Sequence, residues 1–102
     1  MADMISKIKV LEELAKLGGE DEVFLRAIDK LTRYKRDKLQ DDLKDIEAQI
    51  QYFEEEYGMK SHDFVLKFEK GDVGDRIDFM EWASLCDMRE RIMNRLNLLE
   101  GA

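Results

Sequence analysis

The segment LQDDLKDIEAQIQYFEEEYG, residues 39–58, decides the fold. Its apolar residues follow one another at alternating steps of four and three, the heptad spacing of a helix that packs lengthwise against another helix. We call this series the apolar seam, and its members are Leu39, Leu43, Ile46, Ile50, Phe53 and Tyr57. The seam predicts one half of an antiparallel helical hairpin.

The other half of the hairpin is expected at residues 76–99, where apolar residues recur at helical spacing over a similar length. They are Phe79, Trp82, Leu85, Cys86, Met88, Ile92, Leu96 and Leu99. Between the two halves, Gly58 is placed to end the first helix, and Gly71 lies in a glycine-rich and aspartate-rich loop. Residues 61–70 are left as a short helix at the elbow of the hairpin.

The residues before the seam predict two more helical stretches. Residues 3–17 place apolar side chains at helical spacing and precede Gly18 and Gly19, which remove the side chains that would sustain the helix. A long helix over residues 20–57 is expected next, with its first half covered by the helix at 3–17. Lys35 and Arg36 interrupt its apolar stripe, so the helix is either continuous or broken between residues 32 and 38.

The predicted fold class is therefore all-α, with a single helical domain over residues 1–102 and helices at about 3–17, 20–57, 61–70 and 76–99. The chain lacks proline, the strongest helix breaker. Some apolar residues, namely Ile77, Met80, Met93 and Leu98, flank the hairpin stripes and require a second layer. We expect the coiled-coil hairpin to be completed by dimerisation or by another partner.

Composition predicts a soluble, cytoplasmic protein that does not insert into membranes. The chain is 44% hydrophobic and 40% charged, and no stretch approaches the roughly 18–20 apolar residues of a membrane helix. The first residues lack the basic and apolar parts of a signal peptide. The single cysteine, Cys86, cannot form a disulfide within the chain.

Charge is unevenly placed along the chain, whose formal net charge is -7. Residues 39–58 contain seven acids and one base, whereas residues 20–38 contain six bases and five acids. The acidic balance disfavours general nucleic-acid binding. One basic stripe, Arg26, Lys30 and Arg33, is a candidate for weak contact with nucleic acid, although such stripes are more often solvated helix faces.

The chain offers little for catalysis, and we expect a protein that is not an enzyme and binds no cofactor or metal. His62 has no second histidine or distant cysteine with which to complete a site, and Cys86 lies on an apolar stripe. Pairs such as Asp41 and Asp45 share a helix face but lack Glu-x-x-His ligand sets. A metal-dependent nucleotide pyrophosphohydrolase using clustered acids such as Asp41, Glu55 and Glu56 is the less favoured alternative.

A series of residues over about positions 40–99 resembles a known family. The series is Phe53-Glu54-Glu55-Glu56-Tyr57-Gly58-Met59-Lys60-Ser61, then Phe64, Phe68, Glu69, Gly71, Asp75, Asp78, Phe79, Glu81 and Trp82. It is similar to the pattern of small helical antitoxin-type proteins of bacterial and archaeal toxin-antitoxin pairs, called TumA-like. The resemblance implies a non-enzymatic protein that binds and neutralises a small cognate toxin. The alternative is a structural or adaptor helical dimer.

The signature residues are candidates for a protein interface or for a structural elbow. They are Tyr57, Gly58, Met59, Phe64, Phe68, Gly71, Asp75, Asp78 and Trp82. Among them the aromatic residues are expected mainly in the core, the glycines at a helix end and a turn, and the two aspartates as caps of the last helix. The acids of residues 39–58 are candidates to mask a basic toxin surface.

Overall fold

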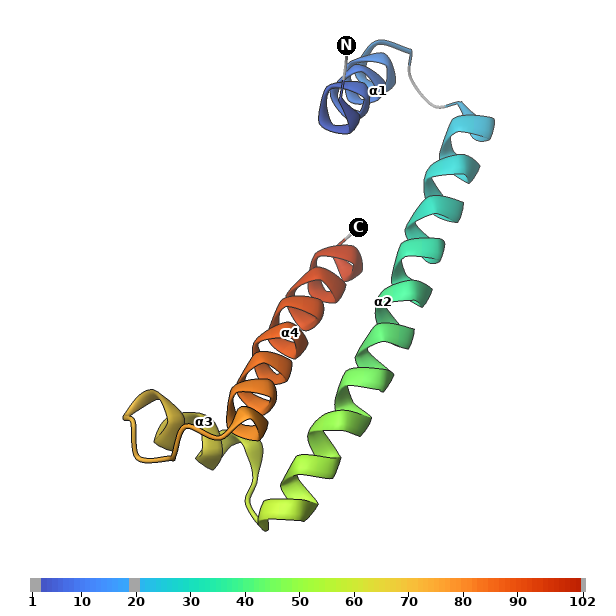
Figure 1. Ribbon diagram of the computed structural model, residues 1–102. Helices are drawn as coiled ribbons and strands as arrows, with labels where there is room; N and C mark the ends of the chain where they lie inside the picture. Colours follow the sequence, from blue (N-terminus) through green and yellow to red (C-terminus); the bar gives the residue numbers. More distant parts are fainter. Residues whose placement is uncertain (1–2, 19–20, 102) are drawn as a thin grey trace. The chain divides into compact units, whose positions relative to one another are not determined.

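The computed structural model describes residues 3–18 and 21–101 and contains four helices and no strand within those ranges (Figure 1). They are α1 (Met4–Gly18), α2 (Glu22–Tyr57), α3 (Ser61–Glu69) and α4 (Ile77–Glu100). The predicted all-α class is confirmed, and each described helix begins and ends within two residues of the predicted bounds. Residues 32–38, where the apolar stripe is interrupted, are helical and lie within α2.

The chain divides into two compact units, an N-terminal unit of residues 1–33 and a C-terminal unit of residues 34–102. The expectation of one domain over residues 1–102 stays a prediction. Within the described ranges, no helix is both long enough and apolar enough for a bilayer crossing.

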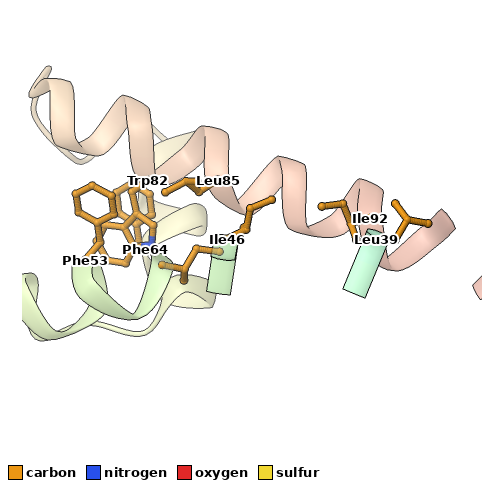
Figure 2. Close-up of a cluster of buried hydrophobic side chains, with 8 residues drawn as sticks. Leu39, Ile46, Phe53, Phe64, Trp82, Leu85 and Ile92 are labelled. Atoms are coloured by element: carbon orange, nitrogen blue, oxygen red, sulfur yellow. The ribbon is translucent and has the colours of Figure 1, made fainter. Parts of the chain in front are cut away.

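The C-terminal unit contains the core. α4 runs back along residues 34–57 of α2, and α3 lies at the turn between them (Figure 1). The buried core residues come from all three helices. They are Leu39, Ile46, Ile50 and Phe53 of α2, Phe64 of α3, and Trp82, Leu85 and Ile92 of α4. Figure 2 shows the aromatic side chains at one end of this core and Leu39 with Ile92 at the other. The apolar seam is therefore on the buried side of α2, with Leu43 and Tyr57 half-buried at its margin.

The N-terminal unit contrasts with this arrangement because none of its described residues is buried. Every described side chain of α1 is exposed, and in residues 21–33 only Phe24 and Thr32 are half-buried. The expected covering of the first half of α2 by α1 is therefore not found. The residues of α1 form a helix as predicted, but no described residue of this unit buries the apolar stripe of that helix.

Glycines end two of the helices. Gly58 follows α2 with a φ of 60° and Gly71 follows α3 with a φ of 74°, both in the left-handed region that favours glycine. After α3, the backbone N–H of Gly71 donates to the carbonyl of Phe68 at 3.1 Å and that of Asp72 to the carbonyl of Lys67 at 2.9 Å. This pair of hydrogen bonds is the Schellman motif. The predicted structural roles of both glycines are confirmed.

Candidate functional site

The end of the hairpin at which α2, α3 and α4 meet is called the elbow. It is built around Trp82, whose side chain is fully buried. The ring of Phe64 stacks on it with centroids 3.8 Å apart and planes 3° apart. Phe53 and Tyr57 stack less closely, each with a centroid 6.0 Å from Trp82. We call these four residues the aromatic cluster. Because their apolar surface is removed from water, they hold α2, α3 and α4 together at the elbow.

Two polar contacts within the elbow connect helices that are distant in sequence. The indole N–H of Trp82 donates to Oγ of Ser61 at 2.9 Å, and this hydrogen bond is buried. The hydroxyl of Tyr57 donates to Oδ2 of Asp78 at 2.6 Å in a partly buried position. This bond to the carboxylate raises the pKa of Tyr57 above its ordinary value. Both donors of the aromatic cluster are thus satisfied.

Glu54 caps α3 from a distance. Its Oε2 accepts a hydrogen bond of 2.7 Å from the backbone N–H of Ser61, the first residue of α3. Lys60, the N-cap residue of α3, makes no side-chain cap, so the carboxylate of Glu54 supplies an acceptor to the N-terminus of this helix. The same hydrogen bond lowers the pKa of Glu54 below its ordinary value, which keeps the carboxylate ionised.

The predicted capping of the last helix is wrong. The N-cap residue of α4 is Arg76, which makes no side-chain cap hydrogen bond. Asp75 lies before it and is exposed, whereas Asp78 lies in the first turn and accepts the hydroxyl of Tyr57. The carboxylate of Asp78 thus makes a tertiary hydrogen bond with Tyr57 and not a local cap of α4. The sequence spacing gave no sign of this partner, which lies 21 residues away.

The remaining signature residues are structural in position. Phe68 and Met59 are half-buried against the core, and Phe68 lies with its ring centroid 5.7 Å from that of Phe64. Met59 donates its backbone N–H to the carbonyl of Glu54 at 3.2 Å and so completes the turn after α2. The structure thus gathers the signature at the elbow and turns its aromatic members mainly inward. Whether any of them also contacts a protein partner stays a prediction.

Most of the acidic side chains of residues 39–58 face outward. Of the seven, Glu54 alone is half-buried, and the other six are exposed. Helical spacing puts Asp41, Asp45, Glu55 and Glu56 away from the apolar seam, spread over an arc of about 100° of the α2 surface. We call these four residues the acidic face. It consists of two acidic pairs, with the exposed and uncharged Ala48 and Tyr52 between them, on a helix that is anchored by the core.

Two grooves lie beside the packed helices of the C-terminal unit. The larger, about 780 Å³, is lined by residues of both signs, among them Lys44, Glu47, Glu54, Lys60 and Arg89. The smaller, about 400 Å³, is lined by the core residues Leu39, Ile46 and Ile92 together with charged residues. Nε of Arg89 is buried and has no hydrogen-bond partner within the described residues. Both grooves are lined by a mixture of apolar, acidic and basic side chains, so neither is suited to one chemical class of ligand.

The residues considered for catalysis are not brought together. His62 is exposed at the start of α3, and Cys86 is half-buried on α4, where burial raises the pKa of its thiol. In the part of the chain that the structure describes, no group of three or more His, Cys, Asp or Glu side chains is placed to hold a metal ion.

The basic stripe is exposed in the N-terminal unit. Arg26, Lys30 and Arg33 all lie on the surface of α2, and Arg26 pairs with Glu22 at 2.7 Å one turn earlier. The stripe is therefore accessible and partly neutralised, as is usual for a solvated helix face. Contact with nucleic acid stays a prediction.

Sequence reasoning missed two residues of the elbow. It assigned no tertiary contact to Ser61, which is the first residue of α3 and accepts the hydrogen bond from the indole N–H of Trp82. It treated Glu54 as one member of an acidic run, although this carboxylate is the cap of α3. Its position seven residues before Ser61 falls outside the spacings of local caps, so no sequence pattern pointed to it.

Comparison with known proteins gave no further assignment. No family model, no curated protein and no solved structure matches the chain.

Proposed function

We propose that this chain is a non-enzymatic protein-binding module of the antitoxin type, which neutralises a small basic toxin by binding it directly in the cytoplasm. The observation that carries the proposal is the acidic face: four exposed carboxylates on a helix whose apolar seam is fixed in a core. Because the helix is held in place, the carboxylates are positioned before the partner arrives. A positive surface would meet them without reordering the backbone.

The resemblance of residues 40–99 to TumA-like antitoxins supports the same proposal. In that pattern the aromatic and glycine residues build the elbow, and the elbow holds α2 and α4 in a hairpin that presents the acidic face. The signature would then act through architecture, whereas Asp41, Asp45, Glu55 and Glu56 would meet the toxin. Antiparallel coiled-coil packing and dimerisation are parts of this proposal.

Co-expression with the small basic product of a neighbouring gene tests the proposal. We expect the two proteins to co-elute in size-exclusion chromatography and the chain to relieve the growth defect that its neighbour causes. Failure of both would overturn the antitoxin assignment.

A matched pair of variants tests the binding surface itself. In one, the four carboxylates of the acidic face are replaced by amides (Asp41→Asn, Asp45→Asn, Glu55→Gln, Glu56→Gln). In the control, four exposed acids elsewhere in the same unit are replaced (Asp63→Asn, Glu69→Gln, Asp72→Asn, Glu90→Gln). We expect the first variant to associate more slowly and to lose most of its salt dependence, and the control to behave like the parent. Equal effects would mean that net charge alone draws the partner.

A structural or adaptor dimer without a toxin is the second candidate, and the N-terminal unit favours it. Among the described residues, eleven of the nineteen large hydrophobic side chains that are exposed lie in residues 3–33. Such a surface is unusual for a monomer and is typical of an association element. This candidate predicts a stable dimer and no change in growth when the neighbouring gene is deleted in cells lacking the chain.

A further inference from the structure

α1 exposes an apolar stripe with the spacing of a two-stranded coiled coil. Met4, Ile8, Leu11 and Ala15 follow one another at steps of four, three and four. Met4 is 74% exposed, Ile8 52% and Leu11 41%, although they share one side of the helix. An apolar side of this kind is stable in water only when another surface covers it.

The residue types along the stripe indicate how many helices pack together in the coiled coil. In heptad positions, Ile8 and Ala15 occupy a, and Met4 and Leu11 occupy d. Within parallel coiled coils, a β-branched residue at a followed by leucine at d favours two strands over larger bundles. The stripe is therefore suited to a two-stranded pair with a helix of the same pattern, and the orientation of the pair depends on the charges beside it.

The charges beside the stripe are complementary to those of a second copy. In this register Lys7 occupies a g position and Glu12 the e position five residues later. These are the two positions that face each other across a parallel pair, so Lys7 of one copy would meet Glu12 of the other, twice by symmetry. Glu12 also contacts Lys16 of its own helix at 3.3 Å, an exposed pair that leaves the carboxylate free to bridge.

The charge balance of the two units also favours a second copy at this surface. Residues 1–33 carry six basic and seven acidic residues, whereas residues 34–102 carry eleven and seventeen. Two copies that meet through the N-terminal unit thus avoid most of the repulsion between acidic surfaces. α1 itself carries three lysines and two glutamates, which is far from the basic polar face of a membrane-surface helix.

We infer that α1 pairs in parallel with α1 of a second copy of this chain, through Ile8 and Leu11 and with Lys7 facing Glu12. The inference deepens the protein-binding function proposed above and rests on it. It assigns self-association to the N-terminal unit and leaves the acidic face free for the toxin.

Sedimentation equilibrium of the full chain, over protein concentrations from about 5 to 500 μM, tests the pairing. The parent should convert from monomer to dimer, and Leu11→Asp should remain monomeric because it places a charge in the paired stripe. Leu98→Asp on α4, where the leucine is 78% exposed, is the matched control and should dimerise like the parent. A parent that stays monomeric throughout, or a Leu11→Asp variant that dimerises fully, would overturn the inference.

Charge exchange separates a second copy from other occupants and parallel from antiparallel pairing. Lys7→Glu or Glu12→Lys alone should weaken dimerisation about tenfold, because each creates two like-charged contacts. The double variant should restore it. Lys9→Glu and Glu13→Lys, at outward positions of the same helix, are the controls and should change it less than twofold. If the double variant is weaker than either single one, the parallel pairing is wrong.

The outcome is independent of toxin binding. If Leu11→Asp is monomeric but still co-elutes with the toxin, both proposals stand. If the parent chain dimerises but binds no toxin, the antitoxin assignment alone is removed. If the parent chain stays monomeric and binds the toxin, the pairing of α1 alone is removed.

Discussion

The N-terminal and C-terminal units contain helices of similar composition but differ in what those helices bury. In residues 34–102 the apolar stripes of α2, α3 and α4 cover one another and enclose Trp82 completely. In residues 3–33 the apolar residues are equally well spaced for helices, yet no described side chain is buried. Amphipathic spacing thus predicts which side of a helix packs against another element. Burial also requires a connection that brings this second element alongside the helix.

Among the described residues, the C-terminal unit differs from the N-terminal unit in having an elbow. In the C-terminal unit, Gly58 turns the chain and α3 fills the end of the hairpin, so that α4 returns along α2. The corresponding residues 19–20 lie outside the described ranges. We therefore expect the C-terminal unit to owe its stability to its own core, and the N-terminal unit to owe its stability to association. Four substitutions test the first half of this statement.

Phe64→Ala should have the largest effect. Phe64 is 1% exposed and stacks on Trp82, so its removal leaves a cavity beside the most buried side chain and should lower the free energy of unfolding by about 3–5 kcal/mol. Leu17→Ala in the N-terminal unit, where the leucine is 84% exposed, should change it by less than about 0.5 kcal/mol. Urea unfolding followed by circular dichroism measures both, and Phe64→Leu provides a milder variant if Phe64→Ala does not fold. Similar losses for Phe64→Ala and Leu17→Ala would contradict the distinction between the units.

Ser61→Ala tests whether the elbow depends on its buried hydrogen bond. The change leaves the indole N–H of Trp82 without an acceptor, which should cost about 1–3 kcal/mol. Ser84→Ala, at an exposed position of α4, is the control and should be neutral or slightly stabilising. Trp82 is the only tryptophan, so its fluorescence reports the elbow directly. An unchanged emission maximum and midpoint in Ser61→Ala would show that water replaces the hydroxyl.

Gly58→Ala tests the turn that creates the hairpin. No atom lies within 4 Å of the added Cβ, so the cost arises from the left-handed backbone and should be about 1–2 kcal/mol. Gly74→Ala is the matched control, because its surroundings are equally open and no positive φ is found there. It should be neutral or stabilising, since alanine restricts the unfolded chain. Thermal unfolding of both variants measures the difference, and equal midpoints would contradict the proposed role of the turn.

Glu54→Gln should have the smallest effect and a distinct pH dependence. The hydrogen bond from Ser61 lowers the pKa of Glu54 below 4.5 in the folded protein, so the folded state binds fewer protons than the unfolded state near that pH. The ionised side chain therefore contributes stability above about pH 4.5, and this contribution is lost as the pH falls through the lowered pKa. At pH 7 we expect Glu54→Gln to lose about 1 kcal/mol, because the charge-assisted hydrogen bond becomes a neutral one at a half-buried position.

Urea unfolding between pH 3 and pH 7 measures this effect, with the exposed Glu55→Gln as the control. The difference between Glu54→Gln and the parent should shrink on acidification, whereas Glu55→Gln should follow the parent throughout. A difference for Glu54→Gln that grows as the pH falls would have the wrong sign for this account.

The sequence predicted the helices well and the contacts at the elbow poorly, for a physical reason. Helix bounds and the apolar seam depend on neighbours three and four residues apart, and these are visible in the order of residues such as Ile46, Ile50 and Phe53. The hydrogen bonds of Glu54 with Ser61 and of Tyr57 with Asp78 depend on how α3 and α4 pack after the turn. A carboxylate that serves such a contact has the same sequence signature as one that faces solvent. The same ambiguity led to the incorrect assignment of Asp78 as a cap.

Hydrogen exchange of the full chain at low and high protein concentration tests the central claim most directly. The amides of α4 and of residues 36–57 should be strongly protected and equally so at both concentrations, because their core lies within one chain. Those of α1 and of residues 22–33 should exchange rapidly in dilute protein and gain protection as the concentration rises. Protection of α1 equal to that of α4 in the most dilute sample would contradict the account.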